Sequence, residues 1–179
     1  MSTAPSQWAT WANALSAFRF CSIPATAFSI LGADWWLAAV LFTLAVITDI
    51  YDGKVARSLN QSSPLGGLVD HATDALFVSA CHAAFATMGV INPYLWPLIL
   101  LSFTQYMLDS KALAGQPLRA SRIGRLNGIS YFALAGVLIG AHALGWQWLV
   151  VLAGWFAWLL VATSVLSMGD RAWALWRLK

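Results

Sequence analysis

The chain contains 179 residues, of which 60% are hydrophobic and 9% charged, and its formal net charge is +3. This composition excludes an ordinary water-soluble domain, because so few charged side chains cannot cover its surface, whereas lipid accepts an apolar exterior. The basic residues are scattered among segments that flank apolar runs, without the basic, aromatic face typical of nucleic-acid binding. We therefore expect an integral membrane protein that forms one domain over residues 1–179.

Six mostly apolar segments have about the 20 residues that an α-helix needs to cross a bilayer. In chain order they span residues 13–31, 35–57, 66–88, 94–112, 123–144 and 147–167. Trp residues concentrate where these segments begin or end, as in the aromatic belts of membrane proteins. The sequence therefore predicts an all-α integral membrane protein with six transmembrane helices. Residues 1–12 are expected to form an interfacial segment, and residues 168–179 a cytoplasmic tail.

The distribution of Lys and Arg predicts the orientation of these helices. The junctions 32–34, 89–93 and 145–146 contain neither residue type. The basic residues instead fall in or beside the alternate junctions and the C-terminal tail: Lys54, Arg57, Lys111, Arg119, Arg122, Arg125, Arg171, Arg177 and Lys179. By the positive-inside rule these segments, and both termini, are cytoplasmic. Arg19 is the exception, one turn into the first predicted span, close enough to the edge to reach water or to serve a site.

Four of the seven acidic residues surround one predicted cytoplasmic loop. Asp49 and Asp52 are three apart before the loop, and Asp70 and Asp74 are four apart after it, so each pair shares a helix face. Because the chain returns directly into the membrane, the two faces can oppose each other and bring four carboxylates into one small volume. A single pair could be a hydrated helix end or an ion pair with a nearby arginine, but four together indicate a functional site.

Carboxylates packed this closely repel one another unless they are protonated or bind a cation. Several oxygen ligands suit Mg²⁺ or Mn²⁺, especially when substrate phosphates complete the coordination shell. Gly53, Ala56 and Gly66 lie at helical spacing beside the aspartates and leave room for a nucleotide or a closely packed helix. Arg57, one turn beyond Gly53, would point a fixed cation towards a pyrophosphate in the same space.

These residues resemble the motif of the CDP-alcohol phosphotransferase family at every fixed position. The run is Asp49-x-x-Asp52-Gly53-x-x-Ala56-Arg57, eight residues, then Gly66-x-x-x-Asp70-x-x-x-Asp74. The stretch Asn13-x-Leu15-Ser16-x-x-Arg19 with Pro24 is similar to the usual N-terminal stretch of that family. The resemblance implies metal-dependent transfer of a phosphatidyl group from CDP-diacylglycerol to a small alcohol, with release of CMP, in phospholipid biosynthesis. It also implies a homodimer, which we expect in a bacterial cytoplasmic (inner) membrane with its active site facing the cytoplasm.

The resemblance further implies a role for each motif residue. Asp49, Asp52 and Asp70 would ligate metal, while Asp74 would help to hold a second Mg²⁺ or Mn²⁺ ion and would deprotonate the acceptor hydroxyl as the catalytic base. The nucleotide would contact the remaining positions together with one metal ligand: Asn13, Asp52, Gly53, Ala56, Arg57 and Gly66.

A second polar group precedes the fifth predicted helix and consists of Lys111, Arg119, Ser121, Arg122 and Arg125. Positive-inside charge alone can account for such a group. The stretch ASRIGRLNG is also similar to the A-S-x-x-G-K segment of the branch that makes phosphatidylglycerol phosphate. That resemblance favours binding of an acceptor phosphate by these residues, and hence glycerol 3-phosphate as the acceptor. Inositol phosphate, inositol, serine and phosphatidylglycerol stay open as alternatives.

Two positions of the aspartate segment depart from that branch. It commonly has Pro after the third aspartate and Lys after the fourth, where this chain has His71 and Ala75. His71 lies on a different helix face from the Asp70 and Asp74 stripe, so we do not expect it to act directly in the chemistry. His82 and His142 are expected to be buried or interfacial spectators.

An ion carrier or channel is the alternative from a different class of function, since acidic groups inside a helix bundle can bind cations. Carriers usually place such groups near the middle of the membrane. Here the acidic cluster lies at one predicted edge, and no comparable charge continues to the other side. The sequence therefore favours the enzyme.

Overall fold

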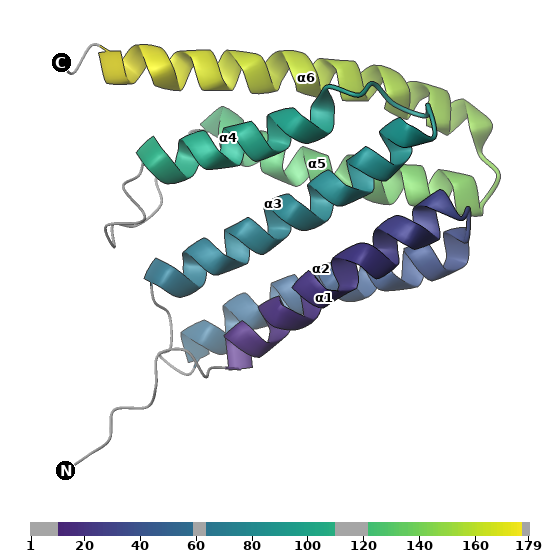
Figure 1. Cartoon of the computed structure of the whole chain (residues 1–179), viewed down its shortest axis with the longest axis horizontal. Helices are drawn as coiled ribbons and strands as arrows, with labels where there is room; N and C mark the ends of the chain where they lie inside the picture. Colours follow the sequence, from purple (N-terminus) through teal and green to yellow (C-terminus); the bar gives the residue numbers. More distant parts are fainter. Residues whose placement is uncertain (1–10, 59–63, 110–121, 177–179) are drawn as a thin grey trace.

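The computed structural model describes residues 11–58, 64–109 and 122–176 (Figure 1). These ranges contain six α-helices: α1 (Trp11–Leu31), α2 (Trp35–Ser58), α3 (Pro64–Thr87), α4 (Leu95–Asp109), α5 (Arg122–Ala143) and α6 (Gln147–Trp176). No β-strand occurs in the described part of the chain, so the all-α prediction is confirmed.

The helices begin and end close to the predicted boundaries, with one difference. The last predicted span ends at residue 167, whereas α6 continues without a break to Trp176. The polar residues that follow Ser167 mark a change in composition, but the segment contains no proline and is rich in Ala, Leu, Trp and Arg, which do not stop a helix. Most of the predicted tail is therefore an extension of α6.

Successive helices run in opposite directions, so that α1 begins and α6 ends at the same end of the molecule (Figure 1). α1 packs against α2 and α3, α4 packs against α3 and α6, and α5 packs against α2 and α6. Residues 32–34 and 144–146 lie close together at the opposite end, and residues 88–94 lie on the same side and run back beside α6 to the start of α4 (Figure 1). We call this side, with its three connections, the turn end.

Local hydrogen bonds explain why the chain reverses direction so tightly at the turn end. Gly89 and Gly145 follow α3 and α5 with φ angles of 72° and 71°, a conformation that glycine adopts without strain. Before α4, Asn92 Oδ1 accepts hydrogen bonds from the Tyr94 and Leu95 backbone N–H groups, both at 3.1 Å. These are the capping interactions expected where helices end and begin.

The core is built from side chains of all six helices, with large residues contributed by α3 and α5. Phe77 and Phe85 of α3 and Leu134 and Leu138 of α5 are almost fully buried. Between α2 and α5 the approach is close, since a Cβ atom at Gly136 would lie 3.0 Å from Phe42 Cε1. The absence of a side chain at Gly136 therefore lets the phenyl ring lie directly against α5.

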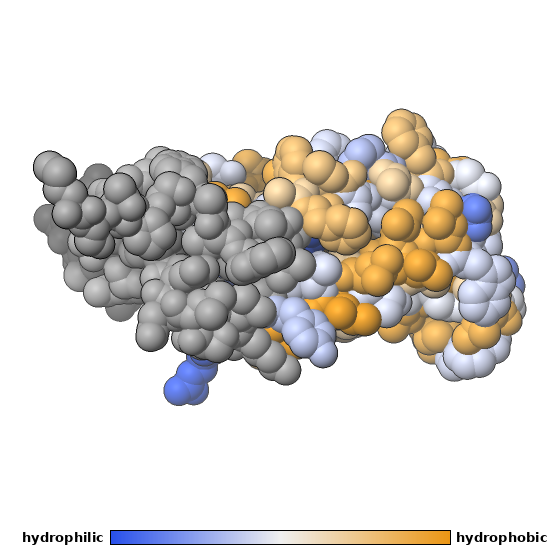
Figure 2. Space-filling view, turned by 90° about the horizontal axis from the view of Figure 1, so that it is seen from below, coloured by the Kyte–Doolittle hydropathy of each residue, from blue (hydrophilic) through white to orange (hydrophobic). Residues whose placement is uncertain are grey.

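The exterior is strongly apolar, as Figure 2 shows over much of its coloured face. Phe28, Trp155 and Leu166, for example, are 72%, 71% and 67% exposed. Among the described helices, two are long and apolar enough to cross a membrane, Arg122–Ala143 and Gln147–Trp173, and shorter apolar helices occupy Ala17–Leu31, Trp35–Tyr51 and Leu95–Leu108. Apolar surface on this scale is consistent with a membrane protein.

Candidate functional site

Three of the predicted carboxylates converge on one arginine of α1. The Arg19 side chain is fully buried, and its Nη1 atom lies 3.0 Å from Asp49 Oδ1 of α2 and 3.1 Å from Asp70 Oδ1 of α3. The same Nη1 atom forms an ion pair with Asp74 Oδ1, one turn further along α3. Because α1 packs against both α2 and α3, it carries the guanidinium between the two acidic helices. We call Arg19, Asp49, Asp70 and Asp74 the carboxylate cluster.

The three carboxylates keep part of their surface open while the arginine is enclosed. The side chains of Asp49, Asp70 and Asp74 are 37%, 28% and 19% exposed, and that of Arg19 is 0% exposed. The buried cation offsets the repulsion that the carboxylates would otherwise feel at this separation. The sequence indicated that Arg19 could reach water or serve a site, and in the structure it is the cation at the centre of the cluster.

Several predicted site residues have surroundings that lie outside the described part of the structure. They are Asn13, Asp52, Gly53, Ala56, Arg57, Lys111, Arg119 and Ser121. Gly66 lies in α3, one turn before Asp70, and is half-buried.

The donor atoms beside Arg19 fit a divalent cation. One carboxylate oxygen each from Asp70 and Asp74 and one ring nitrogen of His71 lie within 4.8 Å of one another. Carboxylate oxygens are the ligands that Mg²⁺ and Mn²⁺ prefer, and imidazole is accepted by several transition metals. Asp49 shares the Arg19 Nη1 atom with these two aspartates but is not part of the group of donor atoms. The described residues therefore bring two carboxylates and one imidazole close enough to share such an ion, with a third carboxylate beside them.

The position of His71 differs from what the helical pattern suggested. Its ring lies close to both aspartates of α3 rather than on a separate face. The reason is that residues 71 and 74 are three apart and are therefore neighbours on the surface of a helix. His71 is also exposed and lines a cavity, so it belongs to the site.

That cavity has a volume of about 370 Å³ and lies among α3, α4, α5 and α6, with one residue from α2. Most of its wall is apolar and includes Val78, Ile99, Phe103, Ile129 and Phe132. The ionisable residues of the wall are Asp49, His71, Asp74, Tyr106, Arg125, Tyr131 and Arg171. The carboxylate cluster thus opens into the same space as two arginines of α5 and α6.

The two arginines differ in what supports them. Arg171 of α6 places its guanidinium carbon 4.9 Å from the centre of the Tyr106 ring of α4, a cation–π contact that orients the charge. The Tyr106 ring in turn makes a T-shaped contact with the His71 ring, with 6.3 Å between ring centres and 71° between planes. Arg125, near the start of α5, completes the basic part of the cavity wall.

Of the basic residues predicted to bind an acceptor phosphate, only two lie in the described part of the chain. Arg125 lines the cavity, whereas Arg122, one turn earlier in α5, is exposed and is not part of the wall. The structure adds Arg171, which the charge pattern treats only as a positive residue of the tail. One sequence signal could have singled out Arg171: it lies at the end of an apolar helix, where an ionisable residue is a candidate for function.

Hydrogen bonds between helices fix the frame around the cavity. Gln105 Nε2 donates to the Met168 carbonyl at 3.0 Å, which ties α4 to α6. The Tyr131 hydroxyl lies 2.6 Å from Ser164 Oγ, and this hydrogen bond ties α5 to α6. These contacts explain how side chains from three helices keep their positions around a mostly apolar space.

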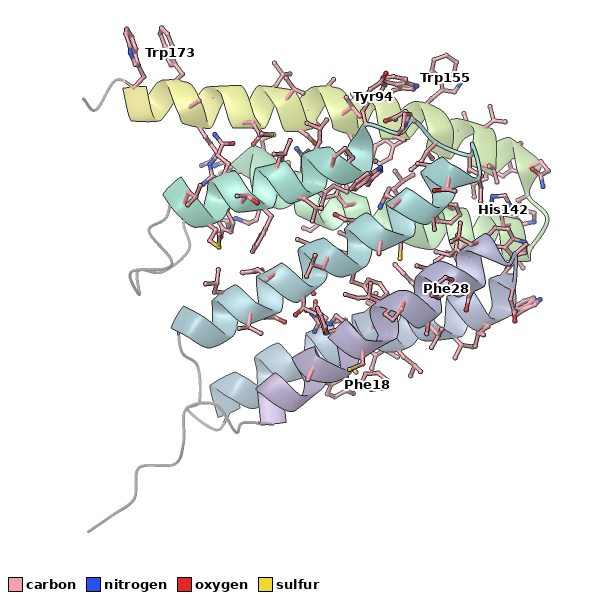
Figure 3. The ribbon with its side chains drawn as sticks, viewed as in Figure 1. Phe18, Phe28, Tyr94, His142, Trp155 and Trp173 are labelled. Atoms are coloured by element: carbon pink, nitrogen blue, oxygen red, sulfur yellow. The ribbon has the colours of Figure 1, made fainter. Side chains whose placement is uncertain are left out.

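Of the remaining two histidines, one is buried and the other is half-buried, which agrees with the buried or interfacial positions expected from the sequence. His82 is fully buried, and its Nδ1 atom lies 2.7 Å from the Val78 carbonyl oxygen. The His142 ring stacks on Trp35, with 4.2 Å between ring centres, and lies at the turn end (Figure 3). Neither residue lines the cavity.

Comparison with known proteins identifies one family over most of the chain. A family model described as CDP-alcohol phosphatidyltransferase matches residues 9–168. A putative cardiolipin synthase of Mycobacterium tuberculosis is 31% identical over 156 residues, which cover 80% of this chain and 71% of that protein.

Two further relatives have a name that includes glycerol 3-phosphate. The CDP-diacylglycerol–glycerol-3-phosphate 3-phosphatidyltransferase of Rickettsia prowazekii is 24% identical over 136 residues, 73% of this chain and 74% of that protein. The protein of the same name from Cereibacter sphaeroides is 32% identical over 102 residues, 54% of this chain and 46% of its own length.

Proposed function

Since the chain belongs to the CDP-alcohol phosphatidyltransferase family, we propose that it transfers a phosphatidyl group from CDP-diacylglycerol to glycerol 3-phosphate and releases CMP. One observation carries the proposal. Asp74 belongs both to the carboxylate cluster and to the wall of the cavity that contains Arg125 and Arg171. An acceptor in this cavity can therefore reach a carboxylate with its hydroxyl while its phosphate pairs with arginine.

On the donor side, the proposal assigns the pyrophosphate and the cytidine to the motif residues. Asn13, Gly53, Ala56, Arg57 and Gly66 would contact the nucleotide, together with Asp52. The ligands of two Mg²⁺ or Mn²⁺ ions would be Asp49, Asp52, Asp70 and Asp74. When bound, these ions neutralise charge on the pyrophosphate and make CMP a better leaving group.

On the acceptor side, the support comes from the two arginines of the cavity wall. A guanidinium presents donors in a planar fork that matches two phosphate oxygens, and the Tyr106 ring holds the Arg171 fork in one orientation. Arg125 adds a second charge to the same cavity. Lys111, Arg119, Ser121 and Arg122 precede this segment or open α5, and they remain part of the proposed phosphate-binding group.

The reaction then needs one proton acceptor and one leaving group. Asp74 takes the proton of the acceptor hydroxyl. The hydroxyl oxygen forms a bond to the phosphorus that carries the diacylglycerol. The bond from that phosphorus to the bridging oxygen of the pyrophosphate breaks, and its electron pair leaves with CMP. The products are CMP and phosphatidylglycerol phosphate, and the proton stays on the Asp74 carboxyl group until it passes to solvent.

Arg19 contributes to this site by positioning the carboxylates. Its Nη1 atom is shared by Asp49, Asp70 and Asp74, so it holds side chains of α2 and α3 at one point. A buried cation among three carboxylates also lowers the cost of assembling them before a metal ion binds. We assign Arg19 a positioning role rather than a contact with the acceptor.

The location of the chemistry follows from the predicted topology. Six membrane-spanning helices with both termini in the cytoplasm would place the carboxylate cluster at the cytoplasmic face, where CDP-linked and phosphorylated substrates are soluble or exposed. We propose a single membrane domain over residues 1–179, with residues 1–12 at the interface, in a bacterial cytoplasmic membrane and as a homodimer.

Phosphatidylglycerol is a second candidate acceptor, and a specific observation favours it. The putative cardiolipin synthase covers 80% of this chain at 31% identity. Phosphatidylglycerol carries the same glycerol and phosphate as glycerol 3-phosphate, with a diacylglycerol attached to the phosphate. Both acceptors therefore present a terminal hydroxyl to Asp74 and a phosphate to the arginines, and the largely apolar wall accommodates the bulkier one.

An acceptor panel tests the proposal. Purified protein in detergent receives CDP-diacylglycerol, Mn²⁺ and one of glycerol 3-phosphate, phosphatidylglycerol, inositol phosphate, inositol or serine, and both CMP and the lipid product are measured. We expect the highest kcat/KM for glycerol 3-phosphate. A higher value for phosphatidylglycerol would select the second candidate. A preference for inositol or serine, which carry no phosphate, would contradict the assignment of the arginines. Metal flux into liposomes without turnover would indicate an ion carrier instead.

A further inference from the structure

His71 lies between the two groups that the proposed reaction requires. One of its ring nitrogens is within 4.8 Å of carboxylate oxygens of Asp70 and Asp74. Its ring also makes a T-shaped contact with the ring of Tyr106, on which Arg171 rests. The cavity wall therefore contains a sequence of contacts from the carboxylate of α3 through the imidazole and the Tyr106 ring of α4 to the arginine of α6.

A glycerol acceptor has its polar groups in a matching order. The reacting hydroxyl is on one terminal carbon, the phosphate is on the other, and a second hydroxyl is on the carbon between them. If the first faces Asp74 and the phosphate faces Arg171, the middle hydroxyl lies along the stretch of wall that His71 occupies. The imidazole can donate a hydrogen bond through one nitrogen and accept one through the other, and the ring is exposed.

We propose that His71 is a specificity-determining residue that binds the middle hydroxyl of a glycerol acceptor. The inference rests on the proposed function, because it needs an acceptor placed between Asp74 and Arg171. It adds a reason for selecting glycerol, since a wall built to hydrogen-bond a substrate hydroxyl rejects an analogue that lacks it. It applies equally to glycerol 3-phosphate and to phosphatidylglycerol, which share this hydroxyl.

The test compares the acceptor with an analogue that lacks only the middle hydroxyl. For glycerol 3-phosphate the analogue is 3-hydroxypropyl phosphate, and for phosphatidylglycerol it is the corresponding phosphatidylpropanediol. The kcat/KM for each acceptor is measured with the wild-type protein, His71→Leu and His71→Gln. The donor KM and the Mn²⁺ concentration that gives half-maximal activity are measured for each protein as well.

The wild-type protein is expected to prefer the natural acceptor over its analogue by roughly tenfold, the effect of one hydrogen bond to a substrate hydroxyl. His71→Leu should lose this preference, because its kcat/KM should fall for the natural acceptor and stay unchanged for the analogue. His71→Gln, which keeps a hydrogen-bonding group, should retain part of it. Donor KM and the Mn²⁺ requirement should change less than about twofold. His142→Gln serves as the matched control, because this imidazole is at the turn end and outside the cavity wall, and it should behave as wild type.

Three outcomes would overturn the proposal. An undiminished preference in His71→Leu would mean that the middle hydroxyl binds elsewhere. An equal loss with both acceptors, accompanied by a raised Mn²⁺ requirement, would make His71 a metal ligand instead. A wild-type protein that turns over the donor with neither glycerol acceptor would remove the proposed function itself, which distinguishes that failure from a failure of the His71 assignment alone.

Discussion

The two ends of the helix bundle bury polar groups in different ways. At the turn end, the His142 ring stacks on Trp35, and Asn92 caps α4 with its side-chain oxygen. These are contacts of single side chains with their neighbours, and among the described residues Asn92 Nδ2 and His142 Nε2 are buried without a hydrogen-bond partner. In the other half, the carboxylate cluster gathers three acidic groups around one buried guanidinium, beside a cavity with two more arginines. Among the described residues, the clustered charged side chains thus lie beside the cavity.

This difference separates an end held by local contacts from the end that we propose to be reactive. Caps and ring stacking hold the turns with contacts between residues of the protein itself. Around the cavity, the charged groups are partly exposed and keep hydrogen-bonding capacity for a ligand. Substitutions at the turn end should therefore change stability and leave kinetics alone, whereas substitutions around the cavity should change kinetics or the response to metal.

The largest effect is expected from Asp74→Asn. The amide keeps the size of the side chain but cannot take the acceptor proton, so kcat should fall by roughly 10²- to 10⁴-fold. The assay is CMP release from CDP-diacylglycerol with saturating acceptor. Asp34→Asn is the matched control, because Asp34 Oδ1 only accepts the Leu37 backbone N–H at 3.2 Å at the turn end, and asparagine caps helices equally well. Full activity in Asp74→Asn would remove Asp74 as the base.

Arg19→Met should mainly change stability, in a way that depends on metal. Removing one partner of a buried ion pair costs about 3–5 kcal/mol, and less is expected here because the three carboxylates are partly exposed. With a chelator present, the melting temperature of the variant should be several degrees below that of wild type. Excess Mn²⁺ should narrow this gap by neutralising the same carboxylates. A gap that Mn²⁺ leaves unchanged would show that Arg19 is not a counter-ion of the metal ligands.

Arg171→Met should weaken the binding of the acceptor and leave the binding of the donor unchanged. A hydrogen bond to a charged group contributes about 1.5–3 kcal/mol, so the KM for a phosphorylated acceptor should rise roughly 10- to 100-fold. The KM for CDP-diacylglycerol should stay within about twofold. Arg125→Met should act in the same direction, and Arg122→Met should have the smaller effect because Arg122 is outside the cavity wall. A raised donor KM in Arg171→Met would instead assign this arginine to the nucleotide.

The smallest kinetic effect is expected from Trp35→Leu at the turn end. Trp35 stacks on His142 at 4.2 Å and on Phe85 at 6.3 Å between ring centres, and each aromatic pair contributes about 0.5–1.5 kcal/mol. The melting temperature should fall by a few degrees, while both substrate KM values stay within about twofold of wild type. A tenfold rise in the acceptor KM would show that the two ends are coupled. It would contradict the assignment of stability effects to the turn end and kinetic effects to the cavity.

Much of the fold could be predicted because its signals are local. Apolar runs of the right length and the residues that interrupt them located all six helices, and only the end of α6 was misjudged, because a polar stretch was interpreted as a helix end. Helical spacing also predicted that Asp49 would face Asp70 and Asp74, which the shared Arg19 contact confirms.

The rest of the site depends on contacts between helices distant in sequence. Spacing along α3 does not reveal that α4 brings Tyr106 beside His71, or that α6 brings Arg171 onto Tyr106. Nor does a single arginine in an apolar segment reveal which helices will enclose it. These placements follow from tertiary packing. The sequence singled out Arg125, which lines the cavity, but the positions of Tyr106 and Arg171 beside His71 could be found only with the structure.

The central claim is that the charged half of the bundle transfers a phosphatidyl group with the help of a divalent metal ion. The most direct measurement is CMP release by the purified wild-type protein from CDP-diacylglycerol, with and without Mg²⁺ or Mn²⁺ and with and without glycerol 3-phosphate or phosphatidylglycerol. The account predicts CMP and a new phospholipid only when metal and acceptor are both present. Phospholipid formation that persists in excess chelator, or no product with any acceptor and metal, would contradict it.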